Sequence, residues 1–163
     1  IYAALKKNLE VYSFEPEPNS FVELFNAVKV NKVNVTPMLI PLDKKTNCNF
    51  FNMDKFVAGL SGHRFGKRDK NKLNYGISSD SIDNLILNNK IPRANYIKID
   101  VDGLEDKVIR GLDNLIKEDI LKSILIEFTN EEQMLFYKMY LKKYNFYVSK
   151  GPSDNNKNYI FSR

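Results

Sequence analysis

The sequence contains one cysteine, Cys48, and one histidine, His63, among its 163 residues. A disulfide needs two cysteines, and a zinc site made of cysteine and histidine needs more such ligands than this chain has. A disulfide framework and a Cys/His zinc centre are therefore excluded. Cys48 stands between two asparagines, and we expect it to be a strand residue and not a nucleophile.

Long hydrophobic runs are also absent. No apolar stretch approaches the roughly 18 residues that a membrane-spanning helix needs. The chain is nevertheless 43% hydrophobic and contains 11 phenylalanines and 9 tyrosines. A chain of this length can bury about two thirds of its unfolded surface. We therefore expect residues 1–163 to form one soluble, cytoplasmic domain.

Acidic residues are scarce in one segment, residues 59–72. This segment has five lysines and arginines against one aspartate, so it carries most of the net charge of +5. Nucleic-acid-binding proteins are usually basic over a broader surface, and we expect no nucleic-acid partner. Because Gly59, Gly62 and Gly66 lower its order, we predict a mobile basic loop that closes as a lid over an anionic acceptor. The alternative is a solvated loop without a partner.

Strand-like and helix-like patterns alternate along the chain. This alternation predicts an α/β fold with a largely parallel sheet flanked by helices, and with an antiparallel strand pair at the C-terminus. The second helix is predicted to begin with a Ser20–Glu23 capping box, and the helix after residue 79 with Ser79 or Asp80 as its cap. The predicted helices are residues 1–7, 20–31, 80–91, 104–111 and 131–143. The predicted strands are 9–14, 34–42, 96–101 and 123–128, a pair at 50–51 and 73–75, and a closing pair at 146–149 and 158–161 across a turn at 151–154.

Acidic side chains follow three of the predicted strands. Glu15 ends the first, Asp100 and Asp102 end the strand taken as central, and Glu127 ends the next. In open α/β sheets the ligand lies outside the carboxyl ends of the strands. A carboxylate has two acceptor oxygens and is suited to both hydroxyls of a ribose, so Glu15 is a candidate ribose ligand. The alternative is a solvated carboxylate stiffened by the neighbouring prolines.

Several of these residues form an ordered set of motifs that resembles the FkbM family of S-adenosylmethionine-dependent methyltransferases. The resemblance extends from about residue 11 to residue 129. It implies a Rossmann-like methyltransferase fold, S-adenosylmethionine as cofactor, and a sugar or other hydroxyl as acceptor. The motif positions include the candidate cofactor-binding residues Glu15, Asn31 and Asp100 and the candidate catalytic residues Asp100 and Asp102. Asp100 is favoured because it stands at a strand end where neither periodicity nor capping requires a charge. The motifs are Phe14-Glu15-Pro16, Asn31, Ser81-Ile82-Asp83-Asn84-Leu85, Lys98-Ile99-Asp100-Val101-Asp102-Gly103-Leu104-Glu105, Gly111 and Ile126-Glu127.

The sequence departs from this family in two places. No glycine precedes Gly59, so the first strand and the glycine-rich turn that cradles the cofactor are absent from this chain. We therefore expect an N-terminally truncated domain that binds cofactor weakly and is inactive without that turn. Asp102 replaces the glutamate that is usual in the motif, which keeps the charge but shortens the side chain.

Other interpretations of the acidic motif remain open. Asp102 and Glu105 have the spacing of a helix capping box. Asp100, Asp102 and Glu105 offer the oxygen ligands of a magnesium site, although we favour no metal. Lys98 is expected to pair with one of these acids. His63 is a candidate general base for an acceptor hydroxyl, and its alternative is a solvated loop histidine.

Two other functions compete with methyl transfer to a small-molecule or glycan-like hydroxyl. One is a non-catalytic Rossmann-like module that binds an anionic partner through the basic loop. The other is a nucleic-acid methyltransferase, which needs a pocket for a flipped base. Such enzymes usually carry an aromatic motif after the central strand, and residues 100–103 contain none.

Overall fold

The computed structural model describes residues 1–60, 62–128, 130–152 and 157–163. Its described residues divide into two compact units. The first unit consists of Ile1–Leu42 and Thr46–Asp80, and the second of Asp43–Lys45 and Ser81–Arg163. In the described part of the chain, no helix combines the length and apolar character that a bilayer crossing requires.

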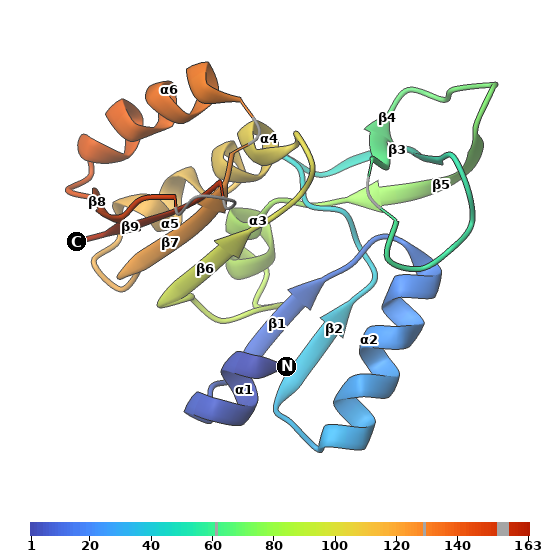
Figure 1. Cartoon of the computed structure of the whole chain (residues 1–163), viewed down its shortest axis with the longest axis horizontal. Helices are drawn as coiled ribbons and strands as arrows, with labels where there is room; N and C mark the ends of the chain where they lie inside the picture. The colour runs from blue at the N-terminus through green and yellow to red at the C-terminus, as the bar shows by residue number, and fades with distance from the viewer. Residues whose placement is uncertain (61, 129, 153–156) are drawn as a thin grey trace. The chain divides into compact units, whose positions relative to one another are not determined.

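The first unit begins with two helices and a parallel strand pair, coloured from blue to cyan in Figure 1. Strands β1 and β2 pair in parallel, with Phe14 opposite Met38. Helix α2 runs beside β2, as Figure 1 shows. The elements are α1 (Tyr2–Lys7), β1 (Val11–Phe14), α2 (Pro18–Asn31) and β2 (Val35–Met38).

Helix α2 begins two residues earlier than the sequence predicts. Its N-cap is Glu17, whose carboxylate accepts hydrogen bonds from the backbone N–H groups of Asn19 (3.1 Å) and Ser20 (2.6 Å). The predicted Ser20–Glu23 capping box is therefore wrong. Pro18 explains the difference, because proline has the backbone angle of a first helical turn and no N–H to satisfy there.

The ionised carboxylate of Glu17 should stabilise the first unit at neutral pH, and this contribution should be lost at acidic pH. Its side chain is buried, which raises its pKa, but the hydrogen bonds from Ser20 and Asn19 outweigh burial, and the pKa lies below 4.5. A lowered pKa contributes stability above the unfolded value that is lost as pH falls. Glu17→Ala should reduce the free energy of unfolding by about 1–2 kcal/mol at pH 7, and by less below pH 4.5.

Urea unfolding at pH 7 and pH 4 measures this difference, and Glu23→Ala in the same helix is the matched control. If Glu23→Ala costs as much as Glu17→Ala, the cap is the one predicted from the sequence and not the one in the structure.

A three-stranded antiparallel sheet completes the first unit. The strand pair predicted at 50–51 and 73–75 is confirmed, with Phe51 opposite Tyr75. Cys48 lies in a strand, as predicted, and is exposed. The segment 59–72, predicted as a loop, also contains a short strand that pairs with β3. That strand has three residues, of which only Phe65 is apolar, so it has no recognisable periodicity. The elements are β3 (Asn47–Met53), β4 (Arg64–Gly66) and β5 (Leu73–Ser79), in the order β4-β3-β5.

The second unit contains a four-stranded mixed sheet in the order β6-β7-β9-β8 (Figure 1). Strands β6 and β7 are parallel, and the β7–β9 and β8–β9 pairs are antiparallel. The predicted closing pair is confirmed, while residues 153 and 154 of its predicted turn lie outside the described residues. The elements are α3 (Ile82–Leu87), β6 (Tyr96–Ile99), α4 (Glu105–Arg110), α5 (Asp113–Lys117), β7 (Ser123–Glu127), α6 (Glu131–Lys142), β8 (Tyr147–Lys150) and β9 (Asn158–Ser162).

These pairings correct the predicted sheet. The fold is α/β, but among the described strands only β1–β2 and β6–β7 are parallel, so a largely parallel sheet is not confirmed. Strand β6, taken as central from the sequence, lies at one edge of the described four-stranded sheet.

Helix α3 is capped by Ser81, whose hydroxyl accepts from the Asn84 N–H at 3.2 Å, and not by Ser79 or Asp80.

The core of the second unit lies between its sheet and its helices. The burial of β7 alternates, with Ile124 and Ile126 fully buried, while β6 and β9 each contribute one buried residue, Ile99 and Phe161. Helices α4, α5 and α6 contribute apolar side chains to the same core. Its most deeply buried members include Ile99, Ile109, Leu112, Leu115, Ile116, Ile124, Ile126, Tyr137, Leu141 and Phe161.

Gly111, which ends α4, is required by a close backbone approach. A Cβ atom at this position would lie 2.4 Å from the carbonyl oxygen of Asp43 and 3.2 Å from the Cβ of Ser81. Gly111→Ala should therefore lower the free energy of unfolding by about 1–3 kcal/mol, because the backbone must move. Gly76→Ala is the control, since no described atom would lie within 4 Å of its Cβ. Equal urea midpoints for the two variants would contradict the close approach.

Candidate functional site

In the first unit, Glu15 lies directly after β1, at the carboxyl end of the parallel pair. Its N–H donates to the Met38 carbonyl at 3.0 Å, which ties it to β2. Its Oε1 accepts from the Glu17 N–H at 2.9 Å. The second oxygen, Oε2, accepts no hydrogen bond from the described residues. A half-buried carboxylate with one oxygen held and the other available is suited to receive a hydroxyl group.

Burial dominates the electrostatics of Glu15. Burial raises its pKa, the Glu17 N–H partly opposes that rise, the Glu17 charge adds to it, and His63 lowers it. His63 thus acts electrostatically on this carboxylate. The structure therefore brings together two residues singled out from the sequence, although 48 positions separate them.

An aromatic cluster joins the β1 end to the three-stranded sheet. The Phe51 ring lies 5.5 Å from the His63 ring and 5.6 Å from the Tyr75 ring, measured between centroids. The Tyr75 hydroxyl donates to the Pro16 carbonyl, next to Glu15. Burial and the charges of Glu17 and Glu15 raise the pKa of Tyr75, so its hydroxyl stays protonated. His63 Nε2 is buried and has no hydrogen-bond partner among the described residues.

Asn31, predicted from the resemblance, lies elsewhere in the first unit. It is the last residue of α2, and its amide donates to the Ala27 carbonyl at 2.8 Å. Glu15 lies just before the first turn of the same helix. A helix of this length separates its two ends by about 20 Å. The structure therefore does not bring Asn31 together with Glu15.

In the second unit, Asp100 follows β6 and Glu127 ends β7. The two strands are parallel, with Ile99 opposite Ile126, so the two acids lie side by side at the carboxyl edge. Each carboxyl group shifts the pKa of the other, and Lys98 Nζ lies 2.8 Å from Asp100 Oδ2. The predicted pairing of Lys98 with an acid of the motif is confirmed.

The pKa values of the two acids are displaced in opposite directions. Lys98 lowers the pKa of Asp100, and the hydrogen bond from Glu127 lowers it further against the effect of burial. Glu127 hydrogen-bonds to Asp100 and faces its charge, and both raise its pKa. At neutral pH the pair can therefore keep Asp100 ionised, and a proton taken up by the pair is held first on Glu127. The sequence motif contains Glu127, but only the strand register shows that it partners Asp100.

The turn after Asp100 is not the predicted capping box. Asp102 and Gly103 have positive φ angles of 45° and 89°, and the N-cap of α4 is Leu104 without a side-chain bond. Glu105 is buried, and its Oε1 accepts from the Gly103 N–H at 2.8 Å. Glu105 thus holds the turn that presents Asp102.

The structure does not support the magnesium alternative. Among the described residues, no three histidine, cysteine, aspartate or glutamate side chains are grouped so that they could hold a metal ion. The set of Asp100, Asp102 and Glu105 therefore forms no such site. Glu105 uses one oxygen for the turn, and its Oε2 has no hydrogen-bond partner in the described part of the chain.

Comparisons with known proteins agree with these strand-end motifs. A family model described as the methyltransferase FkbM domain matches residues 2–148. The fold is similar to a crystal structure of methyltransferase FkbM from Methylobacillus flagellatus KT, with a TM-score of 0.66 and 14% sequence identity. The match covers 99% of this chain and 41% of that one, so the chain spans about two fifths of that protein's length. A search of curated proteins finds no match.

Proposed function

The chain belongs to the FkbM methyltransferase family, and we propose that it transfers a methyl group from S-adenosylmethionine to a hydroxyl oxygen of a small-molecule or glycan-like acceptor. Membership of the family indicates methyl transfer and implies a cofactor of this type in general. The observation that carries the finer proposal is the environment of Glu15, a carboxylate at a strand end with one oxygen available.

Glu15 fits the ribose of the cofactor. Its Oε1 is held by the Glu17 N–H, which fixes the orientation of the carboxylate, and its Oε2 is available to accept from a ribose hydroxyl. A hydrogen bond from a hydroxyl to a carboxylate is charge-assisted and strong. When bound, S-adenosylmethionine would supply an electrophilic methyl group. The predicted cofactor roles of Asn31 and Asp100 remain predictions.

Methyl transfer to a hydroxyl requires alignment and the removal of one proton. The acceptor oxygen forms a bond to the methyl carbon while the bond from that carbon to sulfur breaks, and the hydroxyl proton must leave the oxygen. We propose Asp100 as the group that takes this proton. Lys98 keeps it ionised, and Glu127 offers a second carboxyl on which a proton can rest.

His63 and Asp102 are the other two proposed catalytic residues. The Nε2 of His63 is buried and has no hydrogen-bond partner among the described residues, and we propose it as a second candidate for the proton acceptor. Asp102 is presented by a turn with two positive φ angles, which Glu105 holds. Substitution of each residue separately, with methyl transfer as the readout, determines which one removes the proton.

Two measurements test the proposal. Calorimetric titration should show that the protein binds S-adenosylmethionine, and a radiolabelled methyl group should appear on a panel of sugars. A methyl ether survives mild alkali, whereas a methyl ester is hydrolysed. Label that is released by alkali would show that the acceptor is a carboxylate and would overturn the hydroxyl assignment. A protein that binds no S-adenosylmethionine would overturn the cofactor assignment.

A further inference from the structure

A pocket of about 290 Å³ opens in the three-stranded sheet of the first unit. It is formed by β3, β4 and the turn that follows β4, within the segment predicted as a basic loop. Glu15, His63 and Tyr75 do not line it, so the pocket is separate from the cluster described above. Its lining residues are Asn52, Arg64, Phe65, Gly66, Lys67, Asp69 and Lys72.

Asn52 holds the backbone of this pocket in place. Its side chain is buried, and its amide nitrogen donates to the carbonyls of Arg64 (3.3 Å) and Lys67 (3.0 Å). Its Oδ1 accepts from the Asp69 N–H at 2.8 Å. One side chain therefore fixes both the residue that starts β4 and the turn after it. The two cationic side chains begin from a defined backbone, which reduces the entropy lost on binding a ligand.

The charges of the pocket are not balanced within the described residues. Lys72 lies 2.9 Å from Asp54 and is paired. Arg64 and Lys67 have no acidic partner within ion-pair distance among the described residues. Asp69 is the acid in the lining, and its Oδ1 accepts from the Asn71 N–H at 2.9 Å. Two cations thus face one pocket in which a single carboxylate opposes them.

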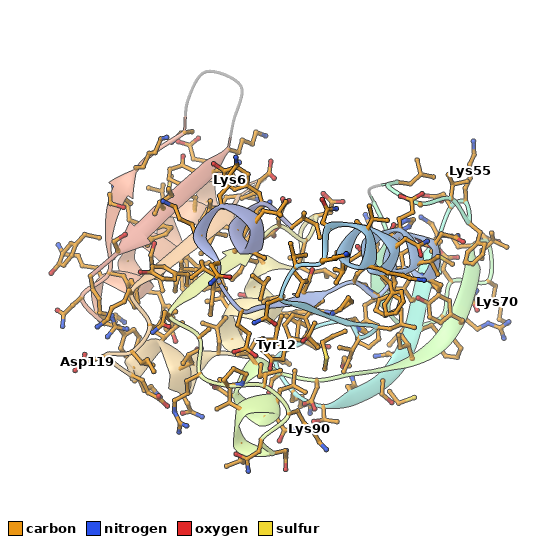
Figure 2. All side chains as sticks on the ribbon, turned by 90° about the horizontal axis from the view of Figure 1, so that it is seen from below. Lys6, Tyr12, Lys55, Lys70, Lys90 and Asp119 are labelled. Atoms are coloured by element: carbon orange, nitrogen blue, oxygen red, sulfur yellow. The ribbon has the colours of Figure 1, made fainter. Side chains whose placement is uncertain are left out.

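The surroundings of Arg64 and Lys67 differ from those of the other cations of the basic segment. Arg68 donates from Nε to Asn74 at 3.0 Å, and its guanidinium lies 5.8 Å from the centre of the Phe50 ring. Lys70 is exposed and does not line the pocket. Figure 2 shows the Lys70 and Lys55 side chains extending outward from the sheet. Arg64 and Lys67 are therefore the candidates for a defined ligand.

We propose that this pocket binds the phosphate group of a phosphorylated acceptor, through Arg64 and Lys67. The planar guanidinium of arginine pairs with two oxygens of a phosphate, and the lysine ammonium adds a compact second charge. A phosphate ester carries close to two negative charges at neutral pH, which matches two cations better than a carboxylate does. The inference rests on the proposed function in one respect, that the phosphate belongs to the molecule that is methylated.

Phosphate binding can be measured without methyl transfer. In an NMR titration of the 15N-labelled protein with inorganic phosphate at pH 7, the amide signals of Gly66 and Asp69 should shift. The double variant Arg64→Gln/Lys67→Gln should bind phosphate about tenfold more weakly. The matched control is Lys55→Gln/Lys70→Gln, which removes the same charge outside the pocket. Equal weakening in both double variants, or no shift in the unaltered protein, would overturn the proposal.

A second arm identifies the source of the phosphate. Glucose 6-phosphate should bind more tightly than inorganic phosphate, because the pocket has room for part of a sugar. Binding no tighter than that of inorganic phosphate would overturn the assignment to an acceptor and leave a free phosphate site. S-adenosylmethionine affinity should be the same in both double variants. A protein that binds phosphate here but no S-adenosylmethionine would contradict the methyltransferase proposal and not this one.

Discussion

Replacing Glu15 with alanine is expected to weaken the binding of S-adenosylmethionine about 100-fold, or by about 3 kcal/mol. The reason is the loss of a charged acceptor from a ribose hydroxyl in a half-buried position, where water replaces it poorly. Isothermal titration calorimetry at pH 7 measures the dissociation constant directly.

Two further variants separate this role from a structural one. Glu15→Gln keeps an oxygen that can accept from the Glu17 N–H, so the β1 end should keep its conformation while the charge is lost. Its affinity should lie between those of the unaltered protein and Glu15→Ala. Glu10→Ala removes an exposed carboxylate just before the same strand, and it should leave affinity unchanged. If Glu15→Ala and Glu10→Ala bind equally well, Glu15 is not a ribose ligand.

Glu15 and Asp100 could be placed from the sequence because each directly follows a short apolar strand. Local alternation locates such a strand end to within a residue or two, and both β1 and β6 end next to the predicted acid. Pairing across the sheet is not local. The register that sets Ile99 opposite Ile126, and hence Asp100 beside Glu127, depends on residues far apart in the chain.

Short sequence patterns for helix caps were ambiguous where one pattern fits two different local conformations. An acidic residue three positions before a glutamate is typical of a capping box, yet Glu105 turns back to the Gly103 N–H and leaves Asp102 outside the cap. The glycine after Asp102 allows this, because its φ of 89° is accessible without strain. At α2 the sequence pattern likewise favoured Ser20 as the N-cap, but the helix begins at Pro18 and its N-cap is Glu17.

The aromatic cluster and the basic pocket had no local signal at all. Tyr75 meets Pro16 across 59 positions, and Asn52 meets Lys67 across 15. The basic segment was recognised by composition, which gives five equivalent cations. In the structure, Arg64 and Lys67 differ from the others because both line the pocket without an acidic partner among the described residues, and Asn52 holds their backbone carbonyls.

Asp100→Asn should reduce kcat about 100-fold or more, because an amide cannot take the proton of the acceptor hydroxyl. The affinity for S-adenosylmethionine, measured by calorimetry, separates loss of chemistry from loss of the cofactor. Asp119→Asn is the control, since its side chain is fully exposed and its contact with Arg163, at 3.3 Å, is a surface ion pair. A kcat for Asp100→Asn equal to that of the control would exclude Asp100 as the base and leave His63 and Asp102.

The pH dependence of kcat gives an independent test through Lys98. Its ammonium lowers the pKa of Asp100, so Lys98→Met should raise that pKa. A base acts only when it is ionised, so the acidic limb of the pH–rate profile should move to higher pH in this variant, with activity recovered once the medium is basic enough. Lys90→Met removes a charge elsewhere in the second unit and should leave the limb in place. If the limb is unmoved in Lys98→Met, the group titrating in it is not Asp100.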